Sequence, residues 1–98
     1  MTHLPPATIL AEASDAARAA VQEAARRPFR NPCCGYAIVA IDGRSRFGRV
    51  YGPRVRARTL GLDMGGCQEV EVYQAAMNAA AAVLNARGVK ARVESWVD

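Results

Sequence analysis

A run of six residues, Tyr36 to Ile41, constrains the fold more than any other part of the sequence. The run is apolar and rich in β-branched side chains, which favours a short strand. Because side chains alternate between the two faces of a strand, an unbroken apolar run indicates that both faces are buried. We therefore expect an interior strand. Asp42-Gly43 follows it and is a strong hairpin signal, so a return strand is expected from about Ser45 to Tyr51.

A helix is expected on each side of these strands. The first should run from about Ile9 to Arg26 with Thr8 as its N-cap, and the second from about Gln68 to Arg87 with Gly88 as its C-cap. In both helices the apolar residues recur at helical spacing. They are Leu10, Ala13, Ala17, Val21 and Ala24 in the first helix, and Tyr73, Ala76, Met77, Ala80 and Leu84 in the second.

The second helix has an unusual lack of charge. It carries no charged residue between Glu71 and Arg87, whereas a surface helix normally has a charged outer face. Two explanations follow: the helix is covered on its outer side, or its alanine-rich back is a contact surface. The second explanation predicts a homodimer through residues 70 to 86.

Two further strands complete the expected order. Residues Arg54 to Leu60 predict a third strand, and the alternation from Val89 to Val97 predicts a fourth. The order α-β-β-β-α-β predicts an α+β fold, a two-layer sandwich with both helices on one face of a mainly antiparallel sheet of three to four strands. The third and fourth strands, joined by a helix, should run parallel. Two early prolines predict a flexible arm over residues 1 to 7, before a single α+β domain over residues 8 to 98.

Six arginines lie between residues 44 and 58, with no acidic residue among them. On a strand, alternation would place Arg54, Arg56 and Arg58 on one face. That face would also hold the matching side chains of the last strand and, depending on the register, Phe47 or Tyr51. The candidate binding residues are Arg44, Arg46, Arg49, Arg54, Arg56, Arg58, Arg92 and Trp96.

An arginine-rich sheet face beside a tryptophan predicts an anionic partner, with nucleic acid as the first expectation. Guanidinium groups neutralise phosphates, and aromatic rings give bases a surface on which to stack. The net charge of +4 agrees with this, and a solvated arginine-rich face in a protein of a GC-rich genome is the competing explanation. The alternative function is a protein-interaction module or inhibitor, such as an accessory protein of a phage or mobile element, that docks on an acidic or nucleic-acid-handling complex. The choice between DNA and RNA stays open.

The segment before the second helix carries two weaker signals. We interpret Gly65-Gly66 as a turn, and glycines before a helix N-terminus also suit an anion. Cys67-Gln-Glu69 at the start of a helix, after a helix and a hairpin, resembles the first half of a cytidine-deaminase-like domain. In that family the cysteine would bind zinc and the glutamate would transfer the proton. The family's Pro-Cys-x-x-Cys motif has no counterpart after the last strand, so the resemblance implies a degenerate relative that lacks the second zinc motif.

The remaining features argue against catalysis. His3 is the only histidine and lies in the expected arm. The three cysteines, Cys33, Cys34 and Cys67, lack Cys-x-x-Cys spacing, so we expect free thiols rather than a metal site or a disulfide framework.

No apolar run is long enough to cross a membrane, and no signal peptide is recognisable. We therefore expect a cytoplasmic, non-enzymatic binding protein without cofactor or metal.

Overall fold

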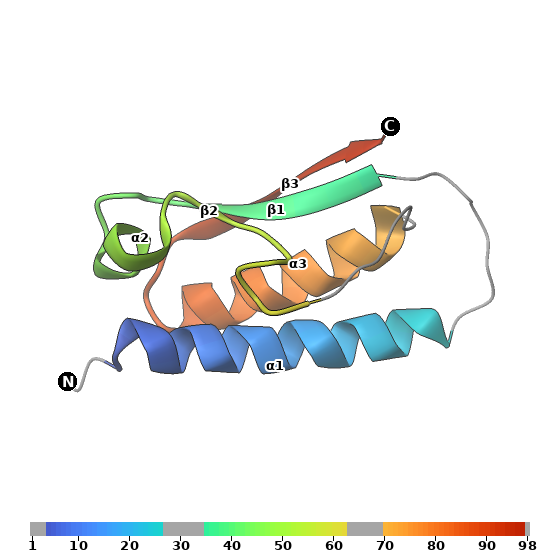
Figure 1. Cartoon of the computed structure of the whole chain (residues 1–98), viewed down its shortest axis with the longest axis horizontal. Coiled ribbons are helices and arrows are strands. Elements are labelled where there is room, and N and C mark those ends of the chain that lie inside the picture. The colour runs from blue at the N-terminus through green and yellow to red at the C-terminus, as the bar shows by residue number, and fades with distance from the viewer. Residues whose placement is uncertain (1–3, 27–34, 63–69, 98) are drawn as a thin grey trace.

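The computed structural model describes residues 4–26, 35–62 and 70–97 of the 98-residue chain. Its elements are, in order, α1 (Pro6–Ala25), β1 (Gly35–Ile41), α2 (Arg46–Tyr51), β2 (Arg54–Val55), α3 (Val70–Ala86) and β3 (Ala91–Val97). The strands form one sheet in the order β2-β1-β3, with β1 antiparallel to both neighbours. Both long helices, α1 and α3, lie on one side of this sheet (Figure 1). The predicted α+β fold is therefore confirmed.

β2 and β3 run parallel to each other, because each is antiparallel to β1. Parallel strands on either side of α3 were expected from the sequence, but β1 lies between them in the sheet. β1 itself is the central strand, and it is fully buried on one face only. On the helix side it contributes three residues to the core, Ala37, Val39 and Ile41. On the other side Ile38 is buried but Tyr36 is exposed, so the expected burial of both faces is correct only in part.

The segment expected to return as a strand from Ser45 to Tyr51 is instead helix α2, so that prediction is wrong. Local hydrogen bonds explain the difference. The Asp42 carboxylate accepts from the backbone N–H of Arg44 at 2.9 Å, and the Asp42 carbonyl accepts from the hydroxyl of Ser45 at 2.7 Å. Ser45 Oγ in turn accepts from the N–H of Gly48 at 2.9 Å and caps the helix. Side chains that bond the nearby backbone compete with a strand ladder, and here they turn the Asp-Gly signal into a helix start.

β2 covers only the first two residues of the strand expected from Arg54 to Leu60. The chain then turns back on itself. The carbonyl of Arg56 accepts from the N–H of Leu60 at 3.1 Å, and the N–H of Arg56 donates to Thr59 Oγ1 at 3.3 Å. Strand alternation therefore does not apply to Arg58, and the expectation that it shares a strand face with the two preceding arginines is wrong.

α1 begins at Pro6, inside the arm expected over residues 1 to 7. Pro5 occupies the N-cap position, and its carbonyl accepts from the N–H of Thr8 at 3.0 Å. Thr8 thus lies in the first turn and does not cap the helix as expected. Proline suits the first helical position because its missing N–H would be unpaired there in any case.

α3 ends at the glycine that the sequence predicts. Gly88 has a φ of 84°, in the left-handed region. The N–H of Val89 donates to the carbonyl of Leu84 at 2.9 Å, and the N–H of Gly88 donates to the carbonyl of Asn85 at 3.1 Å. These two bonds form a Schellman motif. The Asn85 side chain then exchanges two hydrogen bonds of 3.0 Å with the backbone of Ala91, which ties the start of β3 to the end of α3.

α3 lies between α1 and the sheet (Figure 1). Alanines are fully buried in both long helices, Ala13 and Ala17 in α1 and Ala76 and Ala80 in α3. Small side chains allow helices to pack at short interaxial distance. Coverage on two sides accounts for the buried residues of the uncharged stretch of α3, in line with the first of the two explanations above, whereas Asn78, Ala82 and Asn85 are uncharged and exposed. The homodimer through residues 70 to 86 stays a prediction.

An ion pair joins α1 to the residue that follows α3. Arg87 Nε donates to Glu12 Oε1 at 2.8 Å, and Arg87 Nη2 donates to the second carboxylate oxygen. These hydrogen bonds hold the pKa of the Glu12 carboxyl below its ordinary value, and they raise the pKa of the Arg87 guanidinium. Both side chains are accessible to water, so we expect the pair to orient the helices more than to stabilise them.

Candidate nucleic-acid interface

The register of the sheet defines a face that points away from α1 and α3, which we call the open face. Residues directly opposite each other in neighbouring strands share a face. Arg54 of β2 and Arg92 of β3 both lie opposite Ala40 of β1. Further along β1, the partners on β3 are Glu94 and Trp96. The open face consists of Tyr36, Ile38, Ala40, Arg54, Arg92, Glu94 and Trp96.

One end of the open face is cationic. Arg54 and Arg92 are exposed on either side of Ala40. Neighbouring strands lie about 4.8 Å apart, so the Cα atoms of the two arginines are separated by about 10 Å. Arg92 donates to Glu94 Oε2 from Nε at 3.1 Å and from Nη2 at 2.9 Å. Arg54 has no carboxylate partner among the described residues, and we call arginines in this position uncompensated within the described chain.

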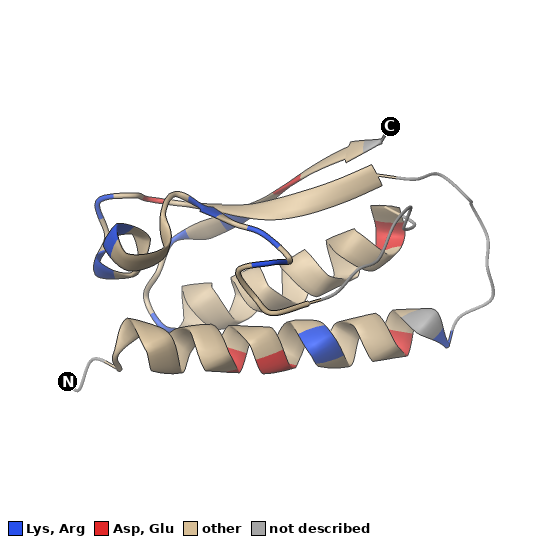
Figure 2. Cartoon of the chain, in the orientation of Figure 1, with Lys and Arg blue, Asp and Glu red and all other residues tan. Residues whose placement is uncertain are grey.

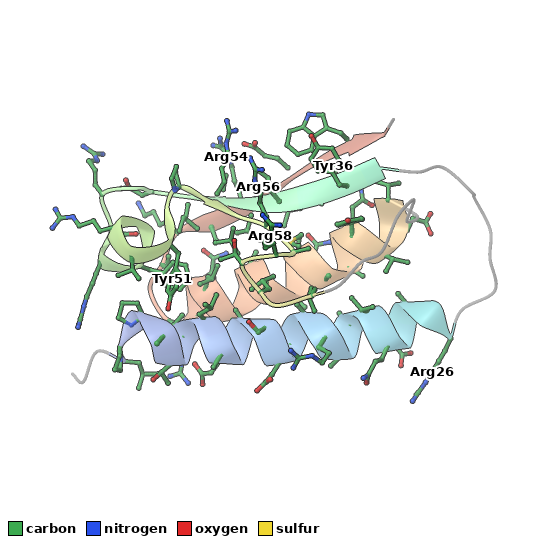
Figure 3. All side chains as sticks on the ribbon, in the orientation of Figure 1. Arg26, Tyr36, Tyr51, Arg54, Arg56 and Arg58 are labelled. Carbon is green, nitrogen blue, oxygen red and sulfur yellow. The ribbon has the colours of Figure 1, made fainter. Side chains whose placement is uncertain are left out.

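Arg56 and Arg58 continue from the cationic end along the turn after β2. Both are exposed, and neither forms an ion pair within the described part of the chain. Figure 3 shows Arg54, Arg56 and Arg58 in descending order from the open face toward α3. The three arginines therefore form a row that runs over one edge of the sheet, and not the flat strand face that alternation predicts.

The other three candidate arginines lie at the α2 end of the molecule. Arg44 pairs with Asp42, with Nε 3.4 Å from Oδ1. Arg46 and Arg49 lie one turn apart on α2, where residues at this spacing share a side of the helix. Both are exposed and have no ion pair with a described carboxylate. They form a second group of uncompensated charges.

A shallow hollow of about 340 Å³ adjoins the cationic end of the open face. Its lining comprises Ala40, Ile41, Asp42, Lys90, Ala91 and Arg92. The backbone N–H and the guanidinium of Arg44 keep the pKa of the Asp42 carboxyl below its ordinary value, and the charge of Lys90 acts in the same direction. The hollow therefore carries two cationic side chains beside a carboxylate that is already hydrogen-bonded, and it extends the cationic surface toward α2.

Basic residues outnumber acidic ones on the side of the sheet and α2, where the described acidic residues are Asp42 and Glu94. Figure 2 shows basic residues along the sheet and around α2, whereas α1 carries three acidic residues, Glu12, Asp15 and Glu23. Arg18 lies in α1 and Arg26 is its C-cap. Each of them pairs with an acidic residue three positions earlier. The uncompensated arginines thus gather on the side of the sheet and α2.

The opposite end of the open face is aromatic. Tyr36 and Trp96 stack across β1 and β3, with ring centroids 4.7 Å apart and an angle of 27° between the planes. Tyr36 was not among the predicted site residues, because the apolar run that contains it indicated burial on both faces. Tyr36 and Ala40 are an even number of residues apart on β1, so their side chains share a face. This spacing identifies Tyr36 as a residue of the open face only when the register with β3 is known.

Two aromatic residues expected as alternatives do not reach the open face. Phe47 is buried in the core with 2% of its surface exposed, because it lies on α2 and not on a strand. Tyr51 is half-buried against it, with ring centroids 4.8 Å apart. Figure 3 shows Tyr51 below α2, on the side of α1. The expectation that either residue joins the arginines is therefore wrong.

Several residues weighed for chemistry lie outside the described residues. They are His3, Cys33, Cys34, Gly65, Gly66, Cys67 and Glu69. Within residues 4–26, 35–62 and 70–97, no group of three or more His, Cys, Asp or Glu side chains is placed to hold a metal ion. In the same ranges, no helix combines the length and the apolar character needed to span a membrane.

Comparison of the chain with protein-family models, with curated proteins and with solved structures gives no match.

Proposed function

We propose that this chain is a non-enzymatic binding protein that engages nucleic acid through the cationic end of its open face and the arginines beside it. The observation that carries the proposal is a group of exposed arginines without a carboxylate partner among the described residues. This group comprises Arg46, Arg49, Arg54, Arg56 and Arg58. Like charges gathered on one side repel one another in the free protein, and an anionic partner relieves that repulsion.

A polyanion fits this arrangement better than a small anion does. Small-molecule sites are concave and bury most of their ligand, whereas these arginines are exposed and spread over β2, the following turn and α2. A nucleic-acid backbone offers phosphates at regular intervals, and each contact releases counterions. Guanidinium groups bind phosphate oxygens through two parallel hydrogen bonds, which makes arginine well suited to this role.

The test removes two arginines from the proposed interface and, as a control, two from the opposite side of the molecule. In the test variant Arg54→Ser is combined with Arg56→Ser, and in the control Arg18→Ser is combined with Arg26→Ser. Both changes lower the net charge equally, and Figure 3 shows Arg26 at the far end of α1. We expect the test variant to lose affinity for single-stranded DNA on the order of tenfold at low salt, and the control to lose much less.

Fluorescence anisotropy of labelled DNA measures both affinities, and circular dichroism checks the fold. Because all four arginines are exposed, both variants should melt within about 4 °C of the parent protein. Equal losses in the two variants would mean that net charge alone drives binding. An unchanged affinity in the test variant would remove Arg54 and Arg56 from the interface.

The second candidate function is a protein-interaction module. It is favoured by the residue types of the open face, because tyrosine, tryptophan and arginine are the commonest hot-spot residues in protein interfaces. This alternative predicts little affinity for free DNA or RNA. The same anisotropy titration of the parent protein therefore separates the two functions.

A further inference from the structure

The two large aromatic side chains at one end of the open face are both exposed to water. Among the described residues, three large hydrophobic side chains are exposed, and two of them are Tyr36 at 45% and Trp96 at 42%. The two rings cover one face of each other, so a large part of the remaining ring surface is in contact with water. A stacked cross-strand pair stabilises a sheet, but stabilisation does not require that much of both rings stays exposed.

The aromatic pair lies on the same sheet face as Arg54, which has no carboxylate partner among the described residues, and as Arg92, which binds Glu94. Tyr36 and Ala40 are four residues apart on β1, which corresponds to about 13 Å along the strand. Arg54 and Arg92 flank Ala40, and so they lie at about this distance from the aromatic pair. Between them lie Ile38, which is buried, and Glu94, whose carboxylate is bound by Arg92. The surface therefore changes from aromatic to cationic along one strand, with its one carboxylate already engaged.

The change from aromatic to cationic side chains along this surface matches a nucleic-acid strand whose bases are unpaired. Base faces in a duplex are covered by the neighbouring base pairs, so they are not available to a ring on a protein surface. In a single strand a base can stack on an aromatic side chain while the backbone runs along a positively charged surface. A sheet face with exposed rings at one end and arginines at the other offers both of these features.

We propose that the ligand of this surface is a single strand, with a base stacked on the Tyr36–Trp96 pair and its phosphates bound by Arg54 and by Arg56 in the turn that follows β2. The inference rests on the proposed function and specifies the class of nucleic acid. It also assigns Tyr36 as a binding residue. The aromatic pair supplies selectivity for unpaired bases, and the arginines supply affinity for any phosphate backbone.

Trp96 is the only tryptophan in the chain, so its intrinsic fluorescence reports directly on the aromatic pair. The protein is titrated with unlabelled oligothymidine and, separately, with the same strand in a duplex. We expect saturable quenching of Trp96 by the single strand, at the concentrations that give the anisotropy signal, and a much smaller change with the duplex. Stacking on an aromatic residue strengthens single-strand binding by between about fivefold and a hundredfold, and the preference over duplex should fall in that range.

Two substitutions test whether the preference for a single strand depends on the aromatic pair. Trp96→Leu should weaken single-strand binding by between about fivefold and a hundredfold and leave duplex binding nearly unchanged. Tyr36→Leu keeps the fluorescent reporter and should reduce both the quenching and the single-strand preference, so the test survives if the first variant misfolds. Val50→Ala is the control, because it removes an exposed apolar side chain of α2 that is 59% accessible. It should bind like the parent protein.

The outcomes separate this inference from the proposed function. If single strand and duplex bind alike and Trp96 emission does not change, the arginines act alone and the single-strand assignment is overturned, while the proposed function stands. If neither form binds at low salt, the proposed function fails and the inference fails with it.

Discussion

Replacing Gly48 with alanine is expected to destabilise the protein by about 2 to 3 kcal/mol, although alanine is the better helix former. A Cβ at this position would overlap the carbonyl oxygen of Asp42 and would lie 2.8 Å from the Cα of Gly43 and 3.0 Å from Ser45 Oγ. Two of these three atoms belong to the backbone, so they cannot rotate away. The turn before α2 would have to move, and the hydrogen bond by which Ser45 caps the helix would be strained.

The control for this prediction lies in the same turn. A Cβ on Gly43 would meet only Pro53 Cβ at 3.5 Å, which is an ordinary contact, and Gly43 does not have a positive φ. Gly43→Ala should therefore stay within about 0.5 kcal/mol of the parent protein. Urea unfolding followed by circular dichroism measures both changes. Equal stability of the two variants would contradict the close packing of the turn on α2.

Leu84→Ala should destabilise the protein by about 2 to 5 kcal/mol and lower its melting temperature by at least about 10 °C. The core contains many alanines, and each buries little apolar area. Within the described chain, the largest fully buried side chains are Phe47, Leu60, Met77, Leu84, Val39 and Val55. So few large side chains leave each with a large share of the hydrophobic stabilisation.

A conservative exchange at the same position isolates the loss of volume. Leu84→Met keeps an apolar side chain of similar size, and we expect it to cost less than about 1.5 kcal/mol. The comparison uses thermal unfolding by calorimetry, with both variants at the same pH. A change below about 1 kcal/mol in Leu84→Ala would show that Leu84 does not occupy a packed core.

The long elements of this fold could be predicted because their signals are local and repeated. The periodicity of α1 and α3 extends over several turns, Gly88 marks the end of α3, and the apolar run predicts β1. These features also predict the fold class. The identity of α2 could not be read from periodicity, because a six-residue helix holds less than two turns. The sequence signal for α2 is the pair of hydrogen-bonding side chains Asp42 and Ser45, and it competes with the hairpin signal of Asp42-Gly43.

The site was harder to predict than the fold, because it depends on the register. A shift of one residue would move every side chain of a strand to the opposite face. The pairing of Tyr36 with Trp96 connects residues that are far apart in the sequence, and no local pattern specifies it. The turn that moves Arg58 off the strand is held by backbone hydrogen bonds from the N–H groups of Leu60 and Leu62 and by the Thr59 hydroxyl, which accepts from the backbone.

The salt dependence of DNA binding tests the central claim most directly, namely that uncompensated arginines bind a phosphate backbone. Anisotropy titrations of a labelled single strand over a series of salt concentrations give the slope of log K against log salt. Each phosphate contact to a single strand contributes about −0.7 to this slope, so three to six arginine contacts predict a value between about −2 and −4. The slope should become less steep by about one to two in the combined Arg54→Ser and Arg56→Ser variant. A slope near zero, or no binding at low salt, would contradict the account.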